Sequence, residues 1–88
     1  MKVKIRKKFL LELSKLSIGI RKDIEQFVFE EFPANPSLKY WKNVRPLKQN
    51  SNLVKILFDE YRIALKLEND AFIFERIRHR DDIYRINS

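Results

Sequence analysis

The sequence has no cysteine, one glycine, three prolines and one histidine among its 88 residues. The absence of cysteine excludes disulfide scaffolds, thiolate zinc sites and cysteine nucleophiles, and it suits a reducing compartment such as the cytoplasm. One glycine cannot form the glycine-rich loops that bind dinucleotides or nucleotide phosphates. One histidine lacks the ligand spacing of a metal site, and no serine has the context of a nucleophile elbow. We therefore expect no metal and no cofactor.

Long apolar runs are also absent, since no segment approaches the roughly 18–20 residues that a membrane-spanning helix requires. The N-terminal segment is basic but alternates in hydropathy, so it does not have the pattern of a secretory signal. The length predicts a single domain over residues 1–88, and the hydrophobic fraction of 44% supports a folded core. We expect no membrane partner.

The formal net charge of +7 is unevenly distributed. Residues 1–8 and 36–58 each carry five bases and no acid, and residues 76–85 carry four arginines. The intervening segments are acidic on balance. A fold that brings the basic segments together creates a positive patch, which attracts polyanions and most often nucleic acid. The same composition also suits a soluble domain with no special partner.

Hydrophobic periodicity divides the chain into two halves. Residues 2–6 alternate between apolar and basic, which predicts a half-buried strand. Apolar residues then recur at helical spacing over 9–16 and 20–32, with Ser17 and Gly19 between the two segments. Pro33 is expected to end the second helix because it lacks an N–H. This half therefore predicts a strand followed by an αα-hairpin.

The second half begins with a loop over residues 34–51 and then returns to period two. Strands are expected over 53–58, 61–67 and 72–78, joined by Asp59-Glu60 and by a turn over residues 68–70. A two-residue loop would place Arg76 and Arg78 on the face of Tyr61, and one more loop residue would reverse this. The element order predicts an α+β fold: an N-terminal strand, an αα-hairpin and a three-stranded antiparallel meander, with the helices on one face of a four-stranded sheet.

Charged residues interrupt the apolar strands at Lys55 and Arg62. Burying such residues is costly, so their face should be open to solvent or ligand. The candidate functional residues are cationic or aromatic: Lys55, Arg62, Lys66, Arg76, Arg78, His79, Arg80, Tyr84 and Arg85. Such a set suits metal-free RNA cleavage, in which the 2′-OH attacks the adjacent phosphate and needs a base, cations for the phosphorane and an acid for the leaving oxygen.

The ordered motifs of the chain resemble the RelE/ParE toxin superfamily over nearly its whole length. They comprise an opening KVKI strand, the helix segment IRKDIEQFV, Leu47-Lys48 after the loop, the YRI strand beginning at Tyr61, and a final HRDDIYR segment beginning at His79. There are three departures. Many members have GDYR where this chain has Asp59-Glu60-Tyr61-Arg62, so the glycine is missing; Gln49 replaces a loop glycine, and Leu57 lies at the position of a second strand lysine.

The resemblance implies a toxin of a toxin–antitoxin pair that cleaves mRNA on the ribosome without a metal. It places Arg62 at the transition-state phosphate, Lys55 near the scissile group as candidate base, and Arg78 near the phosphate or leaving group. It further implies that Tyr84 stacks on the substrate base and that His79 acts as acid or base. If the last strand is regular, Arg78 or His79, but not both, shares the face of Lys55 and Arg62. The bases expected to bind nucleic acid are Arg45, Lys48, Arg80 and Arg85.

The implied partners are a cognate antitoxin, mRNA and the ribosome, and operator DNA only through the antitoxin complex. Three alternatives remain open: a ParE-like toxin that inhibits gyrase by binding, a degenerate toxin kept for its antitoxin-binding surface, and a basic RNA-binding module. Arg78, His79 and Tyr84 favour the ribonuclease over the ParE-like toxin.

Overall fold

The computed structural model describes residues 2–36, 43–47 and 52–83. The elements in chain order are β1 (Lys2–Ile5), α1 (Lys7–Ser14), α2 (Ile18–Gln26), the π-helical turn η1 (Phe27–Glu31), α3 (Phe32–Ala34), β2 (Val44–Pro46), β3 (Leu53–Phe58), β4 (Tyr61–Glu68) and β5 (Ala71–His79). Among these described helices, none is long and apolar enough to cross a membrane.

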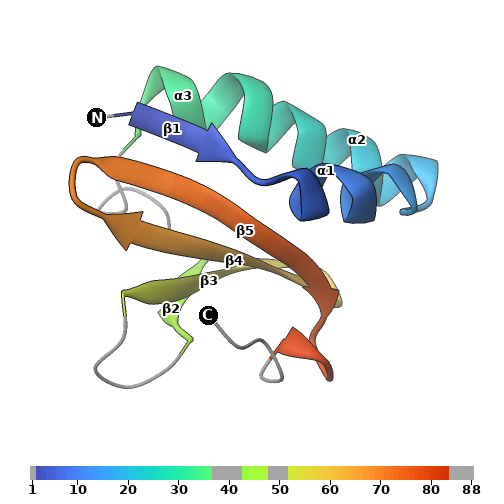
Figure 1. Ribbon diagram of the computed structural model, residues 1–88. Coiled ribbons are helices and arrows are strands. Elements are labelled where there is room, and N and C mark those ends of the chain that lie inside the picture. The colour runs from blue at the N-terminus through green and yellow to red at the C-terminus, as the bar shows by residue number, and fades with distance from the viewer. Residues whose placement is uncertain (1, 37–42, 48–51, 84–88) are drawn as a thin grey trace.

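The strands form one mixed sheet in the order β1-β5-β4-β3-β2. β1 pairs parallel to β5, and the other neighbours are antiparallel. The helices lie over one face of this sheet (Figure 1), so the predicted α+β class is confirmed. The predicted number of four strands was too low by one. The segment expected to be a loop contains β2, which pairs with β3 at the edge of the sheet.

The second helix is longer than its pattern indicated. α2, η1 and α3 follow one another without a break and continue one residue beyond Pro33. Gly19, expected between the helices, is the second residue of α2. Within η1 the Phe32 amide donates to the Phe27 carbonyl, five residues back. This wide turn places Phe32 one turn after Phe27 on the same side, and both rings are buried against the sheet.

The main core lies between the helices and this face of the sheet, which we call the covered face. The Phe74 ring packs against three helix residues, with centroid distances of 5.4 Å to Phe9, 6.4 Å to Phe27 and 5.4 Å to Phe32. Such tilted and edge-to-face pairs add to the free energy gained by burying aromatic area. The alternating apolar residues of β3 and β4 complete this core, among them Ile56, Ile63 and Leu65.

The opposite face of the sheet, which we call the open face, carries a smaller cluster. Leu47, Leu53, Ala64 and Ile83 bury one another there. Ile83 comes from the turn that follows β5, so the chain crosses to this side after the last strand (Figure 1). Elsewhere the described part of the open face mixes apolar residues such as Leu57 and Ile73 with charged ones, most of them basic.

A β-bulge in β5 decides which side chains reach each face. Glu68 is paired with Ala71 across a two-residue turn, and Phe74 is paired with Leu65 on the covered face. The register then shifts by one residue, so that Arg76 is opposite Ala64 and Arg78 is opposite Arg62. Of the two loop lengths left open by the sequence, the structure shows the two-residue turn, but the facing expected from it holds for the first half of the strand only. The extra residue moves Arg76 and Arg78 to the open face.

Candidate functional site

The open face gathers arginine and lysine side chains at one end of the sheet. Arg78 of β5 lies directly opposite Arg62 of β4, and Lys55 of β3 lies two positions from the residue that pairs with Arg62. Arg45 of β2 is paired with Lys55. Because side chains alternate between faces, these four cations share one face. Like charges directly opposite one another repel, so this arrangement weakens the sheet unless counter-charges are close.

Arg62 is held at the β3–β4 turn. Its Nη1 donates to the carbonyl oxygens of Asp59, at 2.7 Å, and of Tyr61, at 2.8 Å. Asp59 has a φ of 51°, in the left-handed region, and its carbonyl is thereby turned toward the guanidinium. One nitrogen of the fork is therefore used to fix the side chain. A guanidinium anchored in this way is pre-oriented for bidentate contact with a phosphate.

Arg76 and Arg78 meet a single carboxylate, that of Glu12 on α1. Glu12 Oε1 accepts a hydrogen bond from Arg76 Nε at 3.0 Å, and Oε2 accepts one from Arg76 Nη2 at 2.8 Å. Arg78 Nε lies farther away, 3.9 Å from Oε2. Hydrogen bonding to Glu12 raises the pKa of Arg76 above its ordinary value. Glu12 thus forms a close ion pair with Arg76. It neutralises Arg78 less, so Arg78 is better able to bind another anion.

His79 lies on the covered side, away from the arginines. It is paired with Tyr61, and the two rings are perpendicular at a centroid distance of 5.9 Å. The Asp81 amide donates to His79 Nδ1 at 3.2 Å, and a Glu60 carboxylate oxygen lies 3.8 Å from Nε2. The register therefore selects Arg78 over His79 as the neighbour of Arg62 and Lys55. His79 instead helps to hold the turn after β5.

The remaining predicted residues are distributed as follows. Arg80 is exposed at the end of β5, and its amide donates to the Glu60 carbonyl at 2.8 Å. Arg45 is exposed on β2, and its Nη1 donates to the Val44 carbonyl at 2.8 Å. Lys48, Tyr84 and Arg85 lie outside the described residues. Of the five predicted catalytic residues, the structure thus brings three together on one face: Lys55, Arg62 and Arg78.

Sequence reasoning missed the part played by Glu12. The helical periodicity identified Glu12 only as a polar position in a Lys- and Leu-rich helix. The available signal was that Glu12 is the only acid in residues 1–22, a stretch that otherwise carries eight bases. Its pairing with Arg76, 64 residues away, depends on the bulge and on how α1 lies along β5, which periodicity does not reveal.

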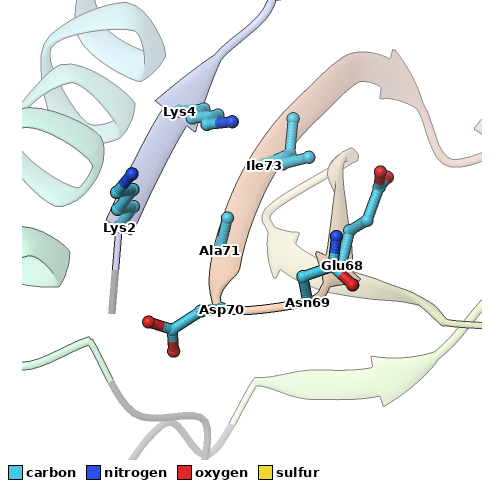
Figure 2. A pocket seen from close by; sticks show the side chains of 7 residues that line it. All are labelled: Lys2, Lys4, Glu68, Asn69, Asp70, Ala71 and Ile73. Carbon is cyan, nitrogen blue, oxygen red and sulfur yellow. The ribbon is translucent and has the colours of Figure 1, made fainter.

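A surface hollow of about 280 Å³ lies at the other end of the open face (Figure 2). Lys2 and Lys4 of β1 line it beside Ala71 and Ile73 of β5, and the turn residue Asp70 lies at its edge. Glu68 also lines it and forms an ion pair with Lys66 at 3.2 Å. A second hollow of about 350 Å³ is lined by Asp23, Glu31 and Asp59 among others. The first lining is balanced in charge and the second is acidic, so both hollows are less suited to a polyanion than the Arg62–Arg78 pair.

The chemistry of this site follows from its charges. Anchored guanidinium groups beside a lysine can bind a phosphodiester and stabilise the extra negative charge of a pentavalent phosphorane. Within residues 2–36, 43–47 and 52–83, no group of three His, Cys, Asp or Glu side chains has an arrangement that could hold a metal ion.

Comparison with known proteins gives concordant results. No family model matches the chain. Toxin RelE3 of Methanocaldococcus jannaschii is 34% identical over 85 residues, which is 96% of both chains. A solved RelB-RelE antitoxin-toxin complex from Methanococcus jannaschii contains a chain that superposes with a TM-score of 0.78 at 29% identity, covering 93% of this chain and 95% of that one. A chain of the toxin-antitoxin complex RelBE2 from Mycobacterium tuberculosis has a TM-score of 0.68 at 18% identity, covering 89% of this chain and 95% of that one. At this identity the likeness supports the fold alone.

Proposed function

Because the chain belongs to the RelE family of toxins, the toxin components of toxin–antitoxin pairs, we propose that it is a metal-independent, ribosome-dependent mRNA endoribonuclease that inhibits translation. The observation that carries this proposal is the direct pairing of Arg62 with Arg78 on the open face, next to Lys55. Two guanidinium groups and the Lys55 amino group at one place suit a scissile phosphate. Residues 1–88 act as one toxin domain, and ribosomal mRNA as the substrate places the activity in the cytoplasm.

The reaction is attack of the ribose 2′-OH on the adjacent phosphate. Lys55 is the candidate base for the hydroxyl proton, and Arg62, held by the turn carbonyls, stabilises the phosphorane. Arg78 contacts the phosphate or the leaving 5′-oxygen, and that oxygen takes its proton from solvent water. Tyr84 stacks on a substrate base, and Arg45, Lys48, Arg80 and Arg85 bind the RNA backbone around the cut. The products are a 2′,3′-cyclic phosphate and a 5′-hydroxyl.

The proposed protein partner is an antitoxin, as in the RelB-RelE complexes of its relatives. The helices expose large apolar side chains that suit such a partner: Leu10, Leu11, Ile18 and Phe29. A chain that lies along amphipathic helices buries residues of this kind. Operator DNA is bound only through the resulting complex.

Tightly controlled induction in a bacterial host tests the nuclease directly. Messenger RNA 5′ ends are mapped while protein synthesis is followed, for the wild type, for Arg62→Ala and for Lys66→Ala. Lys66 lies on the same strand and face but pairs with Glu68, so it is the matched control. New in-frame 5′ ends are expected inside translated codons with the wild type and with Lys66→Ala, and they should be absent with Arg62→Ala. Intact mRNA and undiminished translation with the wild type would contradict the proposal.

One observation favours a second candidate, a degenerate toxin. Leu57 is paired with Arg62, at the position where RelE-like members carry a second lysine, so the site has one cation fewer. In that case cells grow normally on induction although the protein still binds its antitoxin. Filamentation or loss of viability without cuts would instead indicate gyrase inhibition. RNA binding without cuts, weakened by Arg62→Ala, would indicate a binding module only.

A further inference from the structure

The Glu12 carboxylate binds the end of β5 at several points at once. Besides its two hydrogen bonds from Arg76, Oε1 accepts one from the Ile77 amide at 3.0 Å. It is partly buried, with 21% of its side chain exposed, so solvent screens these contacts less than it screens surface ion pairs. The carboxylate therefore joins α1 to both the backbone and the side chains of β5.

This contact replaces a missing strand. β1 pairs with β5 only as far as Ile5 opposite Phe74, followed by a hydrogen bond from the Arg6 amide to the Phe74 carbonyl. The chain then turns into α1, and none of the strands in the described part of the chain lies beside the outer edge of β5 beyond the bulge. Glu12 supplies the acceptor that the Ile77 amide would otherwise find in a neighbouring strand. The part of β5 that carries Arg76 and Arg78 is thereby fixed.

The same carboxylate balances the charge of the open face. Arg78 lies directly opposite Arg62, and Arg76 precedes it by two residues on the same face of β5. Without a counter-charge, Arg76 and Arg78 would both turn away from the other cations. Glu12 draws Arg76 to the edge through two hydrogen bonds and attracts Arg78 more weakly across 3.9 Å. Arg78 is left beside Arg62 with its outer nitrogens directed by electrostatics alone.

We propose that Glu12 is a positioning residue, which acts through Arg76 and the β5 backbone to orient Arg78 beside Arg62, and that Arg76 is part of this clamp rather than a phosphate ligand. The inference rests on the proposed function in one respect, that Arg78 contacts the scissile phosphate. Glu12 is unsuited to be the base itself, because both of its oxygens already accept hydrogen bonds from Arg76 and one also accepts the Ile77 amide.

The test compares Glu12→Gln with Glu30→Gln, which makes the same change of charge at an exposed position of η1. Three quantities are measured on the full chain: cleavage of a defined mRNA on programmed ribosomes, the salt dependence of affinity for a short single-stranded RNA, and the Arg Nε–Hε signals in NMR spectra. For Glu12→Gln, cleavage is expected to fall at least about tenfold, because small misplacements of catalytic groups are costly. RNA affinity should rise and its log–log salt slope should steepen by about 0.7, because Arg76 becomes available to one more phosphate.

The Arg78 Nε–Hε signal should shift or broaden in Glu12→Gln and should stay unchanged in Glu30→Gln. The proposal is overturned if Glu12→Gln cleaves as well as Glu30→Gln, or if RNA affinity and cleavage fall together, which indicates a structural role only. Should Glu12→Gln not fold, Glu12→Asp keeps the charge but shortens the reach, and it should lower cleavage without raising RNA affinity; unchanged cleavage overturns the proposal. If the wild type does not cleave, the proposed function fails, and the Arg78 signal alone decides whether Glu12 positions that side chain.

Discussion

The two faces of the sheet differ in what their side chains contact. On the covered face, Phe74 and its neighbours pack against helix residues, and every position is held by several others. On the open face, Arg62 and Arg78 lie opposite one another and are restrained by turn carbonyls and by one carboxylate. The covered face therefore determines stability, and the open face carries like charges that cost stability and suit a polyanion.

The largest expected effect is on the covered face, at Phe74. Phe74→Ala removes a fully buried ring that contacts three other aromatic rings, and it should lower the free energy of unfolding by about 3–5 kcal/mol. This is much of the total stability of a domain of this size. Thermal and denaturant unfolding measure the loss, with the exposed Phe29→Ala as control. Equal losses for the two variants would contradict the assignment of the core.

The next effect concerns the open face, at Arg78. Arg78→Ala should lower cleavage on programmed ribosomes by about 100-fold, the size of effect seen when one transition-state donor is removed. The unfolding free energy should change by less than about 1 kcal/mol because the side chain is partly exposed and its nearest carboxylate is 3.9 Å away. Lys66→Ala, which removes a cation from the same face that is paired with Glu68, is the control. A stability loss as large as that of Phe74→Ala, with cleavage intact, would remove the distinction between the faces.

A smaller effect is expected at His79. His79→Gln should change cleavage by less than about threefold, because general acid–base groups give about 100-fold or more and this ring lies across the sheet from Arg62. Its unfolding free energy should fall slightly, since Asp81 loses an acceptor. Cleavage rates over a range of pH provide the measurement. A 100-fold loss, or the disappearance of a pH-dependent limb, would show that both faces contribute to the chemistry.

The smallest effect is expected from removing the bulge itself. Deleting Glu75 leaves Phe74 followed by Arg76, and regular alternation then keeps Phe74 on the covered face and Arg76 and Arg78 on the open face. The protein should therefore remain folded, losing only the ion pair of the half-buried Glu75 with the exposed Arg6 at 3.5 Å, which is worth about 1 kcal/mol because solvent screens the arginine. Unfolding and cleavage assays check this. Loss of both fold and activity would show that the bend at Glu75 is needed in its own right.

Much of the fold could be predicted from local pattern. The alternation in β3 and β4 gave the covered and open faces, and the helical spacing gave the two helices, because these features depend on nearby residues. β2 was missed because three residues at an edge, one of them a proline, carry too little periodicity. Which face Arg76 and Arg78 occupy could not be decided from the sequence. A bulge breaks the alternation of a strand, and no residue type in this segment marks its position.

The candidate site was predicted less completely for the same reason. Lys55 and Arg62 could be placed together since both interrupt apolar strands that pair directly. The choice between Arg78 and His79 required the register of β5, and the role of Glu12 required a contact between residues 64 positions apart. The resemblance to a family suggested roles for the motif residues. The geometry added the proposed Glu12–Arg76 clamp, which orients Arg78.

The central claim is that the open face cleaves RNA by attack of the ribose 2′-OH. The most direct test uses ribosomes programmed with two mRNAs that differ only by a 2′-deoxy nucleotide at the scissile position of the A-site codon. The wild type should cut the all-ribose mRNA to a 2′,3′-cyclic phosphate and leave the deoxy mRNA intact, and Arg62→Ala should cut neither. Equal cutting of both mRNAs, or no cutting of the all-ribose mRNA by the wild type, would contradict the account.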